Sequence, residues 1–211
     1  MTHTTDSSLL FDVATYYEGK LALHGEGVLG VDWNSEAGQT LRFEQLCKVV
    51  GTSSFSINDL GCGYGALYDF LAKRKPDFSY AGFDVASGMI STAHKRYNGK
   101  SNARFVVASA PDRIADFGVA SGIFNVRMNR STDEWIKYIH EALDTLDRTS
   151  RLGFSFNCLT SYSDAEKMRH DLHYADPCAL FDLCKRRYSK NVSLLHDYGM
   201  YEFTILVRKH P

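Results

Sequence analysis

From about residue 55 onward, short β-prone runs alternate with segments whose apolar residues recur every three or four positions. The first pattern is typical of buried strands and the second of helices with one apolar face. This alternation predicts an α/β fold with a mostly parallel sheet. The expected strands span residues 57–60, 79–83, 103–108, 117–124 and 151–159, and the expected helices span 66–75, 87–97, 131–146 and 177–188.

The first part of the chain shows helical spacing only. Apolar and aromatic residues between Ser8 and Lys20 predict one helix. A second helix is expected from a cap at Asn34 or Ser35 to a stop at Gly51. These helices precede the first core strand, so we expect residues 1–54 to form a helical cover over the remainder, residues 55–211.

The last part of the chain predicts a hairpin. Residues 191–198 and 201–208 are β-rich and joined by a short turn, which favours two antiparallel strands. The polar stretch 160–176 has no clear period, and it is a candidate for a mobile lid inserted into the core. Pro76 is expected to end the helix before it, and Pro177 to lie in the first turn of the last helix.

A glycine-rich turn follows the first predicted strand. It reads Asp59-Leu60-Gly61-Cys62-Gly63-Tyr64-Gly65, with an acid two residues before three alternating glycines. Glycine lets the backbone turn tightly and approach a ligand without a Cβ in the way. The spacing differs from the G-x-G-x-x-G of dinucleotide-binding proteins. We therefore expect a different adenosine ligand, with Cys62 as a small packing residue in the turn.

A second acid ends the next predicted strand. Asp84 lies 25 residues after Asp59, close to the separation expected for a carboxylate that accepts hydrogen bonds from ribose hydroxyls. A lone Asp at a strand end is more often a helix cap, and Asp84 is open to that role as well. The pair of acids is a more specific signal than either one.

The turn and the two acids resemble the class I S-adenosylmethionine-dependent methyltransferases, whose first motif [DE]-x-G-x-G-x-G is matched at every fixed position. The resemblance covers roughly residues 55–208. It implies a Rossmann-like, doubly wound sheet of seven strands with a C-terminal antiparallel hairpin. It also implies S-adenosylmethionine as the methyl donor and S-adenosylhomocysteine as the product. The residues expected to bind this cofactor are Asp59, Gly61, Cys62, Gly63, Gly65, Asp84, Val85, Ala86, Met89, Ser109, Ala110 and Phe124.

Two departures from the family pattern bear on the ligands. Many relatives carry an acid at the position of Ser109 and use it to accept from the adenine amino group; here a hydroxyl or backbone groups would have to replace it. The exit of the fourth strand lacks the [DN]-P-P-[FYW] motif with which relatives grip adenine bases or glutamine amides. Adenine bases and glutamine amides are therefore less expected as substrates, and we expect a small-molecule acceptor.

The acceptor is expected beyond the carboxyl ends of the strands. Methyl transfer from a sulfonium needs alignment and exclusion of water more than a strong base. An amine or hydroxyl acceptor would need a proton acceptor such as a His or Tyr side chain, whereas a carboxylate acceptor would need a cation. The catalytic candidates are Tyr17, His24, Asn125 and Arg127, and the substrate-binding candidates are Tyr16, Lys20, Trp33, Tyr162 and His196, each with a packing role as its structural alternative.

The composition of the chain disfavours several classes of substrate and partner. The chain has 211 residues and a formal net charge of −1 without a long basic run, which disfavours a nucleic-acid substrate. It has no apolar run of about 20 residues and no signal-peptide layout, so we expect a cytoplasmic monomer or homodimer without a membrane partner. Five cysteines without a C-x-x-C suit reduced thiols. His170 and His173 lie in a polar segment, and we expect no metal.

Two other functional classes remain open. An NAD-type Rossmann oxidoreductase also needs a glycine turn and a strand-end acid, although the glycine spacing and the hairpin argue against it. A non-catalytic binding partner with a methyltransferase fold is the second alternative. Such a protein would be expected to lose the glycine turn or Asp84, and both are intact.

Overall fold

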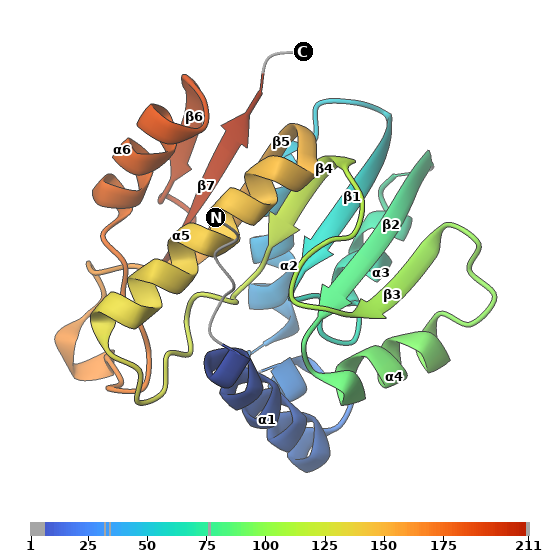
Figure 1. The fold of residues 1–211 in the computed structure, drawn as a ribbon, viewed down its shortest axis with the longest axis horizontal. Coiled ribbons are helices and arrows are strands. Elements are labelled where there is room, and N and C mark those ends of the chain that lie inside the picture. Colours follow the sequence, from blue (N-terminus) through green and yellow to red (C-terminus); the bar gives the residue numbers. More distant parts are fainter. Residues whose placement is uncertain (1–6, 32, 34, 76, 210–211) are drawn as a thin grey trace.

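The structure, a computed structural model, describes residues 7–31, 33, 35–75 and 77–209. Figure 1 shows a twisted sheet between two layers of helices. Its seven strands run in the order β3-β2-β1-β4-β5-β7-β6. This order confirms the predicted doubly wound sheet. The predicted cap at Asn34 and the helix stop at Pro76 lie outside the described residues.

Strands and helices alternate through the core as predicted. The strands are β1 (Ser54–Leu60), β2 (Asp77–Asp84), β3 (Ala103–Val107), β4 (Ala115–Ala120), β5 (Ser150–Leu159), β6 (Asn191–Leu195) and β7 (Glu202–Arg208). The α-helices are α1 (Ser7–His24), α2 (Glu36–Leu46), α3 (Ala66–Ala72), α4 (Ser87–Arg96), α5 (Thr132–Thr149) and α6 (Pro177–Arg187). Short 3₁₀ helices are η1 (Val28–Val31), η2 (Cys47–Val49) and η3 (Ala165–Lys167).

The strand order creates a crevice beside β1. This strand pairs in parallel with β2 on one side and with β4 on the other. The chain leaves β1 toward β2 and β3 and then returns to β4, so the connections after β1 and β4 diverge. Ligands of open α/β sheets bind at such a point, outside the carboxyl ends of the strands. The glycine turn, residues 61–65, lies there.

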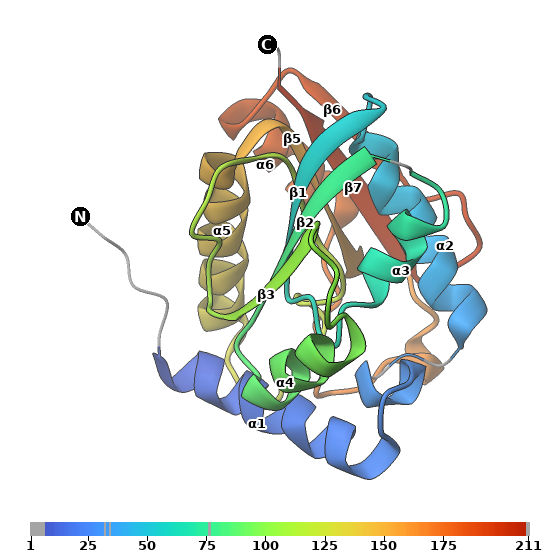
Figure 2. The same cartoon turned by 90° about the vertical axis from the view of Figure 1, so that its right-hand side faces the viewer.

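Helices cover both faces of the sheet (Figure 2). The helices α5 and α6 lie on one side, α2 and α3 lie on the other, and α1 crosses beneath the carboxyl ends of the strands. Helix α5 begins with the predicted capping box, in which Ser131 Oγ accepts from Glu134 N–H and the Glu134 carboxylate accepts from Ser131 N–H. Its apolar face, which includes Trp135 and Leu143, is fully buried.

The fourth strand is shorter than the pattern predicted. The apolar run continues to Phe124, but β4 ends at Ala120. Gly122 adopts a φ of +78°, a left-handed conformation that interrupts an extended strand. Its N–H donates to Asn157 Oδ1 at 2.8 Å. Ser121, rather than Phe124, therefore stands at the carboxyl end of β4.

An extended segment without a helix connects β3 to β4. Residues 108–114 cross the sheet face that α5 also covers. The guanidinium of Arg113 lies against the strands there, donating to the carbonyl of Ile57 at 3.0 Å and to Asn58 Oδ1 at 2.9 Å. One arginine thus satisfies both a backbone and a side-chain group of β1.

The terminal hairpin and the segment before it are both ordered by pairing. β6 and β7 pair antiparallel, as predicted, although β6 ends at Leu195, so the connection is longer than expected. Segment 160–176 contains η3 and is fastened by isolated bridges that pair Val126 with Leu172 and Thr160 with Ala175. Its movement as a lid stays a prediction.

The N-terminal residues divide between two tasks. Tyr17 and Leu21 of α1 pack with Val31 against Met89. Helix α2 instead packs on β5 and β7. The described part of residues 1–54 therefore places α1 and η1 at the carboxyl edge of the sheet and α2 on its face. A domain boundary at residue 54 stays a prediction.

A buried ion pair links α2 to β7. Arg42 donates from Nε and Nη2 to the two carboxylate oxygens of Glu202 at 2.8 and 2.7 Å. Asn157 Nδ2 also donates to Glu202, at 2.7 Å. The guanidinium lies 3.8 Å from the ring centre of Trp33. This network connects α2, β5 and β7 with the loop that holds Trp33.

We expect Glu202→Ala to lower the free energy of unfolding by about 3–5 kcal/mol, because it leaves the Arg42 charge buried without a counterion. Urea unfolding of the purified protein measures this loss. The double variant Arg42→Met/Glu202→Leu removes both charges at similar volume, and it should lose less than the single variant. Equal losses in the two proteins would show that the charge pair is not the cause.

Candidate active site

The glycine turn leaves β1 through backbone conformations that suit glycine. Gly61 and Gly65 have φ values of +76° and +88°. A Cβ on Gly61 would lie 2.1 Å from Ile123 Cγ2, and one on Gly65 would lie 2.6 Å from a ring atom of Tyr97. The N–H of Gly61 donates to the carbonyl of Phe83 at 2.8 Å. Conformation and space thus both require glycine at these positions.

Asp84 fastens this turn to the end of β2. One carboxylate oxygen accepts from the N–H of Gly63 at 2.8 Å, and the other accepts from the N–H of Ala86 at 2.9 Å. Burial raises the pKa of Asp84, and these two backbone donors oppose that rise. The bond to Ala86 at the start of α4 shows that Asp84 also serves the helix, as its position at a strand end suggested. A carboxylate has further acceptor capacity for a ligand.

Asp59 lies near the carboxyl end of β1 and lines the same cavity wall region as Asp84. It is 2% exposed, and Tyr80 Oη donates to its Oδ2 at 2.6 Å. Burial raises the pKa of Asp59 to about 7, against the lowering effect of the Tyr80 hydrogen bond, and the charge of Asp84 adds to the rise. Its second oxygen, Oδ1, has no hydrogen-bond partner among the described residues.

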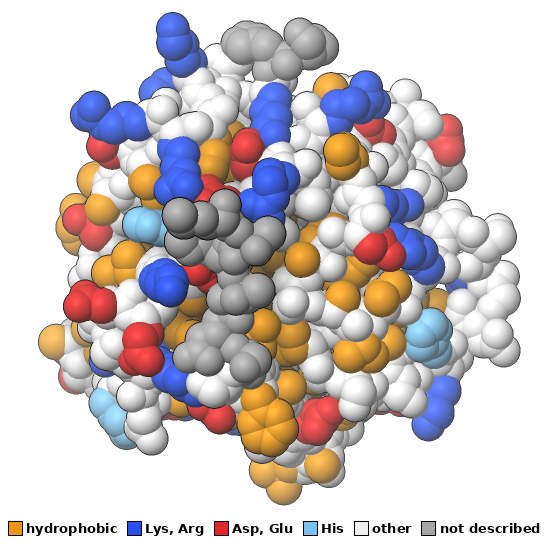
Figure 3. Space-filling model, viewed as in Figure 1, with side chains coloured by type: hydrophobic (Ala, Val, Ile, Leu, Met, Phe, Trp, Pro, Cys, Tyr) orange, Lys and Arg blue, Asp and Glu red, His pale blue; other side chains and the backbone are white. Residues whose placement is uncertain are grey.

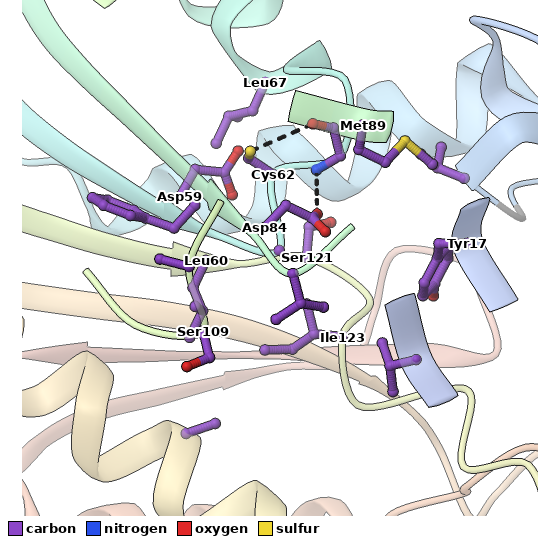
Figure 4. A pocket seen from close by; sticks show the side chains of 18 of the residues that line it. Tyr17, Asp59, Leu60, Cys62, Leu67, Asp84, Met89, Ser109, Ser121 and Ile123 are labelled. Atoms are coloured by element: carbon purple, nitrogen blue, oxygen red, sulfur yellow. Dashed lines mark hydrogen bonds between the residues drawn. The ribbon is translucent and has the colours of Figure 1, made fainter. Parts of the chain in front are cut away.

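These groups surround one cavity of about 1080 Å³, its open mouth included. Figure 4 shows Asp59, Asp84, Ser109 and Ser121 around it, with Tyr17 on the α1 side. The structure brings together most of the predicted cofactor residues. Predicted site residues that line this first cavity are Tyr17, Trp33, Asp59, Gly61, Cys62, Gly63, Asp84, Val85, Met89 and Ser109.

Sequence reasoning missed the wall contributed by β4 and α5. Ser121 and Ile123 line the first cavity because β4 ends early, and Tyr138, Glu141 and Thr145 line it from α5. Burial, followed by the charge of Asp84, raises the pKa of Tyr138. One feature of the sequence could have indicated this wall. Tyr138, Glu141 and Thr145 recur at helical spacing beside the apolar face of α5, and each ends in a polar group.

A second cavity of about 1320 Å³ adjoins the first. Tyr17, Val31 and Trp33 line both. Asn125 lines the second cavity, where its Oδ1 also accepts from the N–H of Leu159 at 3.0 Å. Further polar residues on this wall are Arg42, Lys167, Arg169, Tyr174, Tyr201 and Glu202.

Several catalytic and substrate candidates lie away from both cavities. Arg127 donates to Thr132 Oγ1 at 3.2 Å and is turned toward the start of α5. His24 is an exposed residue at the end of α1. Tyr16 lines a surface depression, where Lys20 Nζ lies 5.3 Å from its ring centre. Tyr16 lines neither cavity although Tyr17 lines both, because adjacent residues of a helix point in different directions.

Other candidates also line neither cavity. Tyr162 is 68% exposed, and its ring lies 5.9 Å from that of His196. Phe124 is fully buried and packs edge-on against Phe156, because the chain has already left β4. Ala86 and Gly65 support the walls from behind, and Ala110 is exposed on the connection to β4.

Unsatisfied polar atoms test whether the first cavity suits the expected cofactor. In the described part of the chain, five buried side-chain polar atoms have no hydrogen-bond partner. Three of them, Asp59 Oδ1, Ser121 Oγ and Glu141 Oε1, belong to residues that line this cavity. Buried polar groups normally have partners, so these atoms indicate a ligand with several donors. S-adenosylmethionine fits, since it carries an ammonium, ribose hydroxyls and an adenine amino group.

Other ligand classes find less support. Among residues 7–31, 33, 35–75 and 77–209, no three or more His, Cys, Asp or Glu side chains are grouped to hold a metal. None of the helices described is long and apolar enough to cross a membrane. On the face shown in Figure 3, acidic and basic side chains are interspersed.

Comparisons with known proteins identify methyltransferases as relatives of this chain. Residues 57–149 match the family model of a methyltransferase domain. Over 155 residues the chain is 64% identical to "Putative methyltransferase Rv1506c" of Mycobacterium tuberculosis, covering 74% of this chain and 93% of that protein.

Two solved structures share the fold. One is the "DhpI-SAM-HEP complex", with a TM-score of 0.65 at 14% identity over 98% of this chain and 100% of that chain. The other is magnesium protoporphyrin IX methyltransferase (ChlM) from Synechocystis PCC 6803 with bound SAM, with a TM-score of 0.65 at 14% identity over 99% and 100%. With its motif, fold and relatives in agreement, the chain belongs to the class I S-adenosylmethionine-dependent methyltransferase superfamily.

Proposed function

We propose that the first cavity binds S-adenosylmethionine and that the second holds a small acceptor, methylated on nitrogen, oxygen or a carboxylate. The observation that carries this proposal is the wall shared by the two cavities, made of Tyr17, Val31 and Trp33. A methyl donor and its acceptor must meet, and these residues border both spaces. The proposal replaces the oxidoreductase and the non-catalytic alternatives.

The two acids, Asp84 and Asp59, bind different parts of the cofactor. Asp84 lies at the end of β2 beside the amide of Gly63, and its spare acceptor capacity suits the ribose hydroxyls. Asp59 Oδ1 and Ser121 Oγ, both buried without a partner, suit the ammonium of the methionine portion. Val85 and Met89 provide apolar contact from the start of α4. Each of these groups is held by secondary structure, which favours a rigid site.

The bound cofactor supplies a methyl group already activated by its sulfonium charge. The protein's part is to align the two reactants and to exclude water. Tyr17 and Trp33 come from the N-terminal cover and stand at the junction of the cavities, where they close the reacting centre. Tyr17 is the candidate to orient an amine or hydroxyl acceptor through its hydroxyl, and in its phenolate form it would receive the proton.

The second cavity suits an acceptor with an anionic group. Lys167 and Arg169 line it, although Lys20 and Arg127, the cations first expected there, do not. Lys167 Nζ lies 3.3 Å from Asp164 and donates to Tyr201 Oη at 2.7 Å. These contacts hold the ammonium beside an aromatic wall, where it can orient a carboxylate or phosphate.

We expect Asp84→Ala and Gly63→Val each to weaken S-adenosylmethionine binding at least about tenfold. The first removes the ribose acceptor, and the second places a branched side chain where φ is +53° and Val31 lies 3.1 Å from the new Cβ. Isothermal calorimetry measures the affinities, and thermal unfolding checks the fold. Asp112→Ala, which removes a surface acid paired with Arg104, is the matched control. Wild-type affinity in both site variants would refute this cofactor site.

Asp59 should make cofactor binding depend on pH. Its pKa of about 7 in the free protein means that the carboxylate gains its charge as pH rises through 7. A cationic ligand favours that charged form, so affinity should fall by up to about tenfold per unit as pH drops below 7. Calorimetry between pH 5.5 and 7.5 measures the slope. Asp59→Asn should bind more weakly and lose this part of the dependence; equal slopes would exclude Asp59.

Folding stability should show the opposite trend. The folded-state pKa of Asp59 is raised, so its contribution to stability is greatest below its unfolded value near 4 and is lost as pH rises through 7. Asp59→Asn avoids that loss. In the absence of cofactor, its Tm relative to the wild type should therefore be higher at pH 8 than at pH 5.

The acceptor can be found by methyl transfer. We expect the wild type to transfer labelled methyl groups from S-adenosylmethionine to an anionic component of a small-metabolite extract, identified by mass spectrometry. With that acceptor, Lys167→Gln should raise KM several-fold and leave the cofactor Kd unchanged. Arg186→Gln, at an exposed arginine of α6, serves as control. An uncharged acceptor, or an unchanged KM, would contradict the anionic class.

A further inference from the structure

The first cavity extends along α5, away from the second. Ser109, Glu141 and Thr145 line only the first cavity, whereas Tyr17 and Trp33 line both. The extension exists because residues 108–114 connect β3 to β4 without a helix, so α5 faces the cavity directly. The cofactor cavity therefore has two ends, one at the acceptor and one at α5.

The proposed function fixes which part of the cofactor takes each end. The methyl group must face the second cavity, on the side of Tyr17 and Trp33, and the ribose lies at Asp84. The base then occupies the remaining end. Ser109 is held beside Asp84 there, because Ala108 N–H donates to the carbonyl of Asp84 at 2.9 Å. Tyr138 lines the same cavity from α5.

Glu141 is an acidic residue that lines the α5 end of the first cavity. It follows Tyr138 by one helical turn, which places both side chains on one face of α5. The side chain is 15% exposed, and its Oε1 is buried without a hydrogen bond. The cation nearest to Oε1 is Lys137 Nζ, 3.9 Å away on a side chain that is 70% exposed. A carboxylate oxygen in this state accepts a ligand donor readily.

We propose that Glu141 accepts a hydrogen bond from the adenine amino group of the cofactor and thereby selects adenine over a 6-oxo purine. The amino group is the donor on the edge of adenine, and an ionised carboxylate only accepts. Ser109 offers a hydroxyl, which donates as readily as it accepts and discriminates less. This inference rests on the proposed placement of the cofactor in the first cavity.

Two ligands that differ at this one position test the proposal. S-adenosylhomocysteine has the amino group, and S-inosylhomocysteine has a carbonyl oxygen in its place. By calorimetry the wild type should prefer the adenosyl compound by at least about thirtyfold, because the carbonyl would face an acceptor. Glu141→Gln can donate to that carbonyl through its amide, so the preference should fall at least about tenfold. Glu44→Gln, at an exposed acid of α2, should keep it.

A second variant and a structure complete the test. Ser109→Asp in the Glu141→Gln background supplies a new carboxylate at the same end and should restore the preference. A crystal structure of the wild type with S-adenosylhomocysteine should show a Glu141 oxygen about 3 Å from the amino nitrogen. An unchanged preference in Glu141→Gln, or a separation beyond about 4 Å, would overturn the inference and leave the proposed function standing. Failure of the wild type to bind either compound would overturn both.

Discussion

The carboxylate of Asp84 is the contact on which the first cavity depends. It accepts from Gly63 in the turn after β1 and from Ala86 at the start of α4, so one side chain sets the positions of three elements. Parallel pairing of β1 with β2 brings the two strand ends together, and the hydrogen bonds then fix the turn between them. The turn approaches Asp84 through positive φ values, which favour glycine. The glycines of the turn and the acid at the strand end therefore depend on each other.

Burial of Asp59 is unfavourable for the charged form of this side chain in the free protein. The side chain is almost inaccessible, and its one hydrogen bond, from Tyr80, does not offset the loss of solvation. A protein selected only for stability would place an amide or an apolar residue there. The same holds for Ser121 and Glu141, whose unpartnered atoms line the same wall. The buried polar atoms without hydrogen bonds thus belong to residues that line this cavity, where a polar ligand would supply the missing bonds.

The fold and half of the site could be predicted from the sequence because both depend on local pattern. The glycine spacing, the strand-end acids and the capping box at Ser131 each concern residues a few positions apart, and the alternation of strands and helices sets the sheet order. The early end of β4 was harder to foresee. Residues 117–124 have the apolar and small residues of a continuous buried strand, and one backbone angle at Gly122 turns the chain.

The other half of the site depends on tertiary contact. Tyr138 and Glu141 belong to a helix whose sequence pattern predicts an apolar face and a solvated face. Neither face is expected to carry a polar side chain that lines a cavity. Both side chains reach the first cavity because no helix among the described residues connects β3 to β4. A helix in that connection would pack against α5 and cover them. A short connection thus changes which helix lines the first cavity. Residues 108–114 form that short connection, and Ser109 within it and Glu141 on α5 line the same cavity.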